Sequence, residues 1–137
     1  MPEPRRFLFV SHQALIHDLA IEVQKEGHPV KYFIASRGDK DVADGFLEKV
    51  DDWESHKDWA DIVVFDDTEY GETAERLRRQ GKRVIGGTRN TDRLENDREH
   101  GQEEMRAAGL SVLPHWDFAS FDAAIEFLER HPVRYVV

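Results

Sequence analysis

The sequence has 137 residues, a length typical of one domain with one hydrophobic core. Its 28 acidic residues outnumber 19 basic ones, and the net charge of −9 argues against a broad nucleic-acid-binding surface, although a local arginine cluster could still bind a phosphate. Cysteine is absent, which excludes disulfides, thiol catalysis and thiolate metal ligands. No apolar run approaches the ~18 residues of a membrane span, and no signal-peptide pattern is present. We therefore expect a cytoplasmic protein.

The first half of the chain predicts alternating strands and helices. Residues 6–11 (RFLFVS) form a continuous apolar run, which is typical of a strand buried on both faces. Residues 12–27 have the apolar spacing of one helix face, and residues 30–35 (VKYFIA) predict a second strand. After a polar loop, residues 46–53 alternate weakly and indicate a third strand. Residues 61–66 (DIVVFD) predict the clearest buried strand of the chain.

The pattern continues with a helix over residues 73–80 and a short strand over residues 82–85. A glycine pair then precedes an unusually polar helix over residues 91–108, with Thr91 or Asp92 expected as its N-cap. The buried face of this polar helix is expected to consist of Leu94, Met105 and Ala108.

The C-terminal stretch predicts one more helix between two short strands. The strands are expected at residues 111–113 and 133–137. Ser120 is the expected N-cap of the helix, whose buried stripe has helical spacing and consists of Phe121, Ala124, Ile125 and Leu128.

Alternation of strand and helix predicts an α/β fold, a Rossmann-like three-layer arrangement of a parallel sheet with helices on both faces. In such sheets ligands bind at the carboxyl ends of the strands, near the point where the strand order reverses. The stretches in which to look for a site are therefore residues 11–17, 66–71 and 86–91.

The first of these stretches, SHQALIH, contains no glycine; none occurs between Val10 and Gly27. Standard dinucleotide binding needs glycines in this turn, so that backbone N–H groups can approach a pyrophosphate, and it is therefore disfavoured. Ser11, His12 and Gln13 can still offer side-chain donors. His17 is too far round the helix to share a metal simply with His12. Local capping and packing roles for the two histidines remain the alternative.

The second stretch, FDDTEYGE, places paired aspartates after the clearest strand. Such a pair can hold Mg²⁺ or receive a phosphoryl group, as in receiver domains. A receiver domain also needs acidic residues after its first strand and a lysine after its fifth, and this chain has neither. We predict no metal site here. A capped turn formed by Asp66, Asp67 and Thr68 is the alternative.

In the third stretch, Gly86 and Gly87 precede the polar helix. A glycine pair before a helix N-terminus can form a small anion site, which Arg89, Arg93 and Arg98 could reinforce. The alternative is that these arginines are only solvated surface residues.

Residues 84–115 (VIGGTRNTDRLENDREHGQEEMRAAGLSVLPH) resemble the closing segment of the N-terminal domain in ATP-grasp ligases, most closely in the phosphoribosylamine–glycine ligase (glycinamide ribonucleotide synthetase) branch. These enzymes have a glycine-containing turn, a helix with a Leu-Glu-x-Ser/Asp-Lys motif, a Met and then a Gly-Ile/Val segment leading to Pro. The matching positions here are Gly86–Thr88, Leu94–Glu95, Asp97–Arg98, Met105 and Gly109–Pro114.

The resemblance implies a Rossmann-like pre-ATP-grasp domain over residues 1–113, followed by a helix and strand over residues 114–137 that lead toward an ATP-grasp domain. That domain would be the partner of this segment. The complete enzyme would use ATP and Mg²⁺, whereas this chain alone would bind neither and would contain no catalytic residue. A homodimer is a further alternative for its assembly.

Site residues follow from the same resemblance. Those facing a small-molecule substrate would be Ser11, His12, Gln13, His17, Asp67, Thr68 and Glu69, and those facing the nucleotide would be Gly87, Thr88 and Arg98. Of the family's glycine-rich first turn, only His17 and Leu19 match, and Arg98 replaces the lysine of the helix motif. These departures imply a divergent relative with a different carboxylate or amine substrate.

The resulting hypothesis is the N-terminal substrate-binding domain of an ATP-dependent carboxylate–amine ligase of purine biosynthesis, inert as an isolated fragment. The alternative is a stand-alone Rossmann-like domain that binds a small ligand, or the N-terminal half of a glycosyltransferase. Residues 17–33 (HDLAIEVQKEGHPVKYF) resemble the helix and strand at the start of those transferases.

Overall fold

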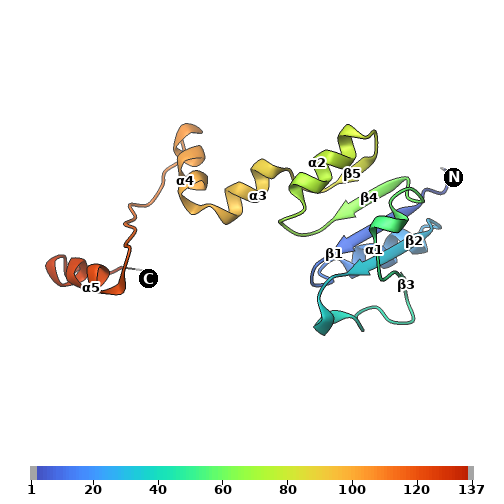
Figure 1. Cartoon of the computed structure of the whole chain (residues 1–137), viewed down its shortest axis with the longest axis horizontal. Helices are drawn as coiled ribbons and strands as arrows, with labels where there is room; N and C mark the ends of the chain where they lie inside the picture. Colours follow the sequence, from blue (N-terminus) through green and yellow to red (C-terminus); the bar gives the residue numbers. More distant parts are fainter. Residues whose placement is uncertain (1–2, 136–137) are drawn as a thin grey trace. The chain divides into compact units, whose positions relative to one another are not determined.

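The computed structural model describes residues 3–135, which fall into two compact units that divide after Glu104 (Figure 1). The first unit contains the whole sheet, and the second contains the C-terminal helix. No helix among the described residues has the length and apolar character needed to cross a membrane.

The sheet of the first unit has five strands, all parallel, in the spatial order β3-β2-β1-β4-β5. This topology confirms the predicted α/β, Rossmann-like fold class. Each predicted buried strand of the first unit forms, and the weak alternation of residues 46–53 contributes a strand of two residues. The strands are β1 (Phe7–Ser11), β2 (Val30–Ile34), β3 (Glu48–Lys49), β4 (Ile62–Phe65) and β5 (Arg83–Ile85).

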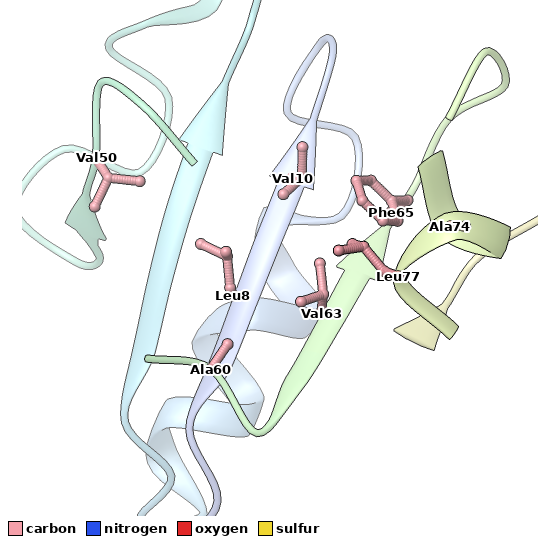
Figure 2. Close-up of a cluster of buried hydrophobic side chains, with 8 residues drawn as sticks. All are labelled: Leu8, Val10, Val50, Ala60, Val63, Phe65, Ala74 and Leu77. Atoms are coloured by element: carbon pink, nitrogen blue, oxygen red, sulfur yellow. The ribbon is translucent and has the colours of Figure 1, made fainter. Parts of the chain in front are cut away.

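One face of the sheet packs against α2 (Gly71–Arg79). Leu8 and Val10 of β1 and Val63 and Phe65 of β4 point to this face, where Leu77 of α2 contacts them (Figure 2). The segment around the short 3₁₀ helix η2 (Glu54–His56) completes this side through Val50 and Ala60, with Trp53 and Trp59 at its border.

The opposite face packs against α1 (His17–Lys25). Because side chains alternate along a strand, Phe9, Tyr32 and Val64 point to this face and bury Ala20 of α1. Beyond β2 the chain makes a second 3₁₀ helix, η1 (Arg37–Asp39). Helical layers thus cover both faces of one parallel sheet.

The helix predicted from residue 12 begins only at His17. Ala14 has a φ of 60°, in the left-handed region that a right-handed helix cannot contain, and its side chain is buried. Residues 12–16 therefore form a loop over the end of β1. At the other end of α1, Gly27 has a φ of 91°, the conformation that commonly ends a helix.

The polar helix predicted over residues 91–108 is two helices, α3 (Arg89–Asn96) and α4 (Arg98–Ala107). Asp97 between them is extended, and its carboxylate accepts hydrogen bonds from the His100 N–H at 3.0 Å and the Arg93 Nε at 3.2 Å. The break arises because the aspartate competes for a helix N-terminus, as a capping residue does.

The start of this polar stretch also differs from the prediction. Thr88 is the N-cap of α3, so Thr91 and Asp92 lie inside its first turn. The side chains of Thr88 and Thr91 form a reciprocal capping box. The three expected buried residues of this stretch, Leu94, Met105 and Ala108, are all exposed.

In the second unit, α5 (Phe121–Arg130) forms as predicted, and the Ser120 hydroxyl caps it by accepting the Ala123 N–H at 3.3 Å. Its predicted buried stripe is wrong, because Phe121 is 90% exposed and Ile125 is 52% exposed. The packed face carries Phe127, whose ring contacts those of Trp116, Phe118, His131 and Tyr135.

The strands predicted at residues 111–113 and 133–137 are absent from the described part of the second unit, since residues 111–113 and 133–135 are irregular. An isolated strand leaves its backbone N–H and C=O groups without partners, and the residues described here provide no neighbouring strand. Residues 136 and 137 of the second prediction lie outside the described residues.

Candidate functional site at the carboxyl edge of the sheet

The strand order defines one switch point in the sheet. From β1 the chain builds β2 and β3 on one side, then crosses to place β4 and β5 on the other. In open α/β sheets the crevice for a ligand lies at the carboxyl ends of the strands that flank such a point. Here those strands are β1 and β4, which end at Ser11 and Phe65.

A hydrogen bond joins the two strand ends. The Ser11 hydroxyl donates to Oδ2 of Asp66 at 2.5 Å, and the Ser11 side chain is fully buried. The other carboxylate oxygen of Asp66, Oδ1, is buried without a hydrogen-bond partner among the described residues. Burial raises the pKa of Asp66, the Ser11 hydroxyl opposes that rise by hydrogen bonding, and the neighbouring charge of Asp67 adds to it.

Tyr32 of β2 adds a third polar group on the same face of the sheet. The Tyr32 side chain is fully buried, and its hydroxyl has no hydrogen-bond partner among residues 3–135. Burial raises the pKa of Tyr32, and the charge of Asp66 contributes in the same direction. Ser11, Tyr32 and Asp66 are called the switch-point cluster below. Its two unpaired oxygens are unusual, because buried polar groups are nearly always hydrogen-bonded.

The predicted substrate-side residues of the first turn lie around this cluster. His12 and Gln13 are exposed in the loop after β1. His17 opens α1; its Nδ1 lies 2.8 Å from the carbonyl oxygen of Ala14, and its Nε2 lies 3.0 Å from Oδ1 of Asp18. Local contacts therefore hold the His17 ring, as the packing alternative expects, whereas His12 and Gln13 present their side chains to solvent.

The predicted residues after β4 form the turn that leads into α2. Oδ1 of Asp67 accepts the Thr68 N–H at 2.8 Å, and Glu69 is exposed with a φ of 72°. These contacts are those of a capped turn. Within the described residues, no hydrogen bond joins this turn to His12, Gln13 or His17. The side-chain link between the two strand ends is the hydrogen bond of Ser11 with Asp66.

Asp66 and Tyr32 are the members of this site that the site prediction left out. The signal for Asp66 lies in the alternation of β4, because Val64 belongs to the α1 face and the residue two positions later returns to it. A tyrosine within a strand, such as Tyr32, is typical of a hydrophobic core. Only the order of the strands in the sheet shows that its hydroxyl lies near Asp66.

The turn after β5, at Gly86 and Gly87, is satisfied by groups of the protein itself. The Arg78 guanidinium of α2 donates to the carbonyl oxygens of Gly86 at 2.6 Å and Gly87 at 2.8 Å. The Thr88 N–H donates to Oγ1 of Thr91 at 2.6 Å, and the Arg89 N–H donates to Oε1 of Glu75 at 3.1 Å. The anion site predicted here would have to compete with these contacts.

The three arginines predicted to reinforce that anion site differ in their partners. Arg89 pairs with Glu72 at 2.7 Å and Arg93 with Asp97 at 3.2 Å. Arg98, at the start of α4, is exposed and makes no hydrogen bond or ion pair within residues 3–135. It is therefore the arginine of the three that can meet a ligand without breaking an existing pair.

The described residues contain no group of three or more His, Asp or Glu side chains arranged to hold a metal ion. What the geometry does provide is a switch point with hydroxyl and carboxylate groups, next to a loop that exposes the imidazole of His12 and the amide of Gln13. Such groups can bind and orient a small polar molecule.

The fold and its switch point place the chain among Rossmann-like α/β domains. No protein-family model matches the sequence. A search of curated proteins likewise finds no match. Two synthetases are among the solved structures that share the fold. One is N5-carboxyaminoimidazole ribonucleotide synthetase from Thermotoga maritima, with 13% identity and a TM-score of 0.64 over 90% of this chain. The other is N5-carboxyaminoimidazole synthetase from Staphylococcus aureus complexed with ADP, with 14% identity and a TM-score of 0.68 over 95% of this chain.

The match covers 36% and 37% of those two chains, so this sequence spans little more than a third of their length. At such low identity the likeness establishes the fold. The sheet lies in the first unit, which ends at Glu104. A match over 95% of this chain therefore also includes residues of the second unit.

Proposed function

We propose that this chain is the N-terminal substrate-binding domain of an ATP-dependent carboxylate–amine ligase of the ATP-grasp class, acting in purine biosynthesis. The observation that carries the proposal is the structural match to the two synthetases, which extends past the sheet into the C-terminal unit. The segment of residues 84–115, with its similarity to phosphoribosylamine–glycine ligase, supports the same class independently and favours that branch.

The reaction of such a ligase has two steps. The carboxylate oxygen attacks the γ-phosphorus of ATP, giving an acyl phosphate and ADP. The amine nitrogen then attacks the acyl carbon, a proton leaves the nitrogen, and the carbon–oxygen bond to phosphate breaks. When bound in the complete enzyme, Mg²⁺ would neutralise charge on the phosphates.

The role of this chain in that reaction is to bind and orient. Under the proposal, Ser11, His12, Gln13 and His17 line the substrate side and Asp67, Thr68 and Glu69 lie opposite, while Gly87, Thr88 and Arg98 face the nucleotide. Arg98 suits that role because it is exposed and unpaired within residues 3–135 and carries a permanent positive charge.

The domain boundaries of the proposal follow the sequence resemblance. Residues 1–113 would be the pre-ATP-grasp domain, and residues 114–137 would lead into the ATP-grasp domain that completes the nucleotide site. The exposed Phe121 and Ile125 of α5 fit a helix that another domain covers. By itself the 137-residue chain would not form ADP.

ADP formation tests this proposal. The complete protein that contains this chain is assayed with ATP, Mg²⁺ and a panel of carboxylates and amines, and ADP release should require one carboxylate and one amine together. Arg98→Ala should raise the KM for ATP by about tenfold or more, as expected for loss of one charged contact to phosphate. Arg79→Ala, at an exposed arginine of α2, is the matched control and should leave KM unchanged. Absence of ADP release with every pair would contradict the proposal.

A further inference from the structure

We propose that Asp66 is a specificity-determining residue, and that its carboxylate keeps phosphate-bearing groups away from the N-terminus of α1. The inference builds on the proposed substrate role of this edge of the sheet and names a property of the substrate. The molecule that binds here carries no phosphate at the α1 end, so the portion that meets α1 is neutral or cationic.

The first step concerns the helix end itself. In Rossmann-like domains the N-terminus of the first helix is the usual anion site, because its free N–H groups and the helix dipole both favour negative charge. In this chain α1 begins after Ile16, and no side chain caps it. The preceding loop has a side chain at every position, and that of Ala14 is buried beneath it. A ligand phosphate therefore lacks the glycine-lined approach that the anion site normally has.

The second step places Asp66 at this helix end. Val64 of β4 belongs to the core cluster on the α1 face, so Asp66, two residues later, points to the same face. The Ser11 hydroxyl holds the carboxylate there through the 2.5 Å hydrogen bond. Among the influences on the pKa of Asp66, burial raises it most, while the backbone N–H of Ile16 lowers it by favouring the ionised form. A carboxylate of the protein thus lies at the end of β1, beside the loop that leads into α1.

The third step is the charge of the surroundings. The stretches Ser11–His17 and Asp66–Tyr70 contain no lysine or arginine, and the second contributes Asp67 and Glu69. Basic residues follow β2, but Lys40 lies over the ring of Phe33, and neither Lys40 nor Arg37 pairs with Asp66. A phosphate at α1 would therefore meet carboxylates without a compensating cation, which is unfavourable at short range.

Phosphate binding to the 137-residue chain tests this inference. The chain is titrated with inorganic phosphate, and separately with ribose 5-phosphate against ribose, at constant ionic strength. The NMR amide signals of Ile16, His17 and Asp18 report on the helix end. The natural chain should show no saturable shift up to ~20 mM phosphate. Asp66→Asn, which keeps the shape and removes the charge, should bind at least about tenfold more tightly than the natural chain.

Glu26→Gln is the matched control, since it removes an exposed carboxylate at the opposite end of α1. This control should behave as the natural chain does. The amide spectrum of the sheet checks that each variant folds, and Asp66→Ser serves if Asp66→Asn does not. Saturable phosphate binding by the natural chain would overturn the inference, and so would a folded Asp66 variant that gains no binding. Neither outcome affects the ADP assay, so the proposed function can fail or survive separately.

Discussion

The two units of this chain differ in what they bury. In the first unit, both faces of the sheet are covered and residues such as Leu8, Tyr32 and Leu77 have no exposed surface. In the second unit, no residue from 105 to 135 is buried, and Phe121 and Leu113 are 90% and 83% exposed. Apolar residues therefore form a closed core in the first unit and leave an open surface in the second.

Size explains much of this difference. A segment as short as the second unit has too little volume to enclose side chains, whereas the first unit is long enough for a sheet with helices on both faces. The second unit retains one aromatic cluster, in which Phe127 contacts Trp116 and Phe118. Under the proposed function, the following ATP-grasp domain covers the remaining apolar surface.

The largest loss of unfolding free energy is expected from Leu77→Ala. Leu77 of α2 is fully buried against the sheet, and truncation leaves a cavity, which typically costs about 2–5 kcal/mol. Ile125→Ala removes a comparable side chain from α5, but that side chain is 52% exposed, so the cost should stay within about 0.5 kcal/mol. Urea unfolding of both variants measures the contrast. Equal losses of unfolding free energy in the two variants would show that the second unit has a core of its own.

A smaller loss of stability is expected from Gly71→Ala, at the start of α2. An added methyl group would collide with the Thr88 carbonyl and the Asp92 carboxylate, which accepts the Gly71 N–H at 2.8 Å. Overpacking of this kind typically costs about 1–3 kcal/mol. Gly38→Ala is the control, because the nearest atom to its methyl would be the Ser36 hydroxyl oxygen at 3.8 Å. The midpoint of thermal unfolding should be lower for Gly71→Ala than for Gly38→Ala. An unchanged midpoint for Gly71→Ala would contradict the contact of α3 with α2.

A pH-dependent gain of stability is expected from Asp66→Asn. The folded-state pKa of Asp66 is raised by burial, so ionisation favours the unfolded chain, and the natural protein loses stability as pH rises from the unfolded value through the folded one. The variant should therefore have a higher urea midpoint at pH 7, and its advantage should shrink as pH falls toward 4. An advantage that persists unchanged at low pH would show that charge is not its cause.

The Asp61 carboxylate is expected to behave in the opposite way. Arg6 holds the pKa of Asp61 well below its usual range through a side-chain hydrogen bond, a backbone hydrogen bond and charge. The stabilisation is therefore present above the unfolded pKa and is lost as pH falls through the folded one. Asp61→Asn should lower the urea midpoint at pH 7, and this deficit should shrink steadily as pH falls below the usual aspartate range, about 4. A difference in urea midpoint between Asp61→Asn and the natural protein that stays constant with pH would contradict this role of the Asp61 charge.

The smallest effect is expected from Arg130→Ala in α5. Arg130 pairs with Glu126 one helical turn earlier, but both side chains are more than half exposed. Exposed pairs of this type contribute about 0.3–0.5 kcal/mol at most. Circular dichroism of the variant should retain its helix signal, and a loss of α5 would show that this pair holds the helix.

The sequence was most informative where burial on both faces leaves a continuous apolar run, as in β1 and β4. It was misleading where one backbone angle or one carboxylate decides the outcome. The left-handed Ala14 delays α1, and Asp97 divides the polar helix, although neither effect has a periodic signal. The stripe of α5 failed because its spacing describes an apolar face without saying whether anything covers it.

The candidate site shows the same limit. Ser11 and the paired aspartates could be located from the strand ends, but choosing Asp66 over Asp67 requires knowing which face of the sheet each one meets. Tyr32 required knowing which strands are neighbours, because Tyr32 and Asp66 belong to strands on opposite sides of β1. Such cross-strand information is absent from the linear pattern.

The most direct test of the central claim is the intact mass of the natural protein that contains this chain, measured together with its ADP release. The account predicts a mass well above the 15.9 kDa of the 137 residues, with ADP formed only when a carboxylate and an amine are both supplied. A natural protein of 15.9 kDa that forms no ADP, alone or with a separate ATP-grasp partner, would contradict it.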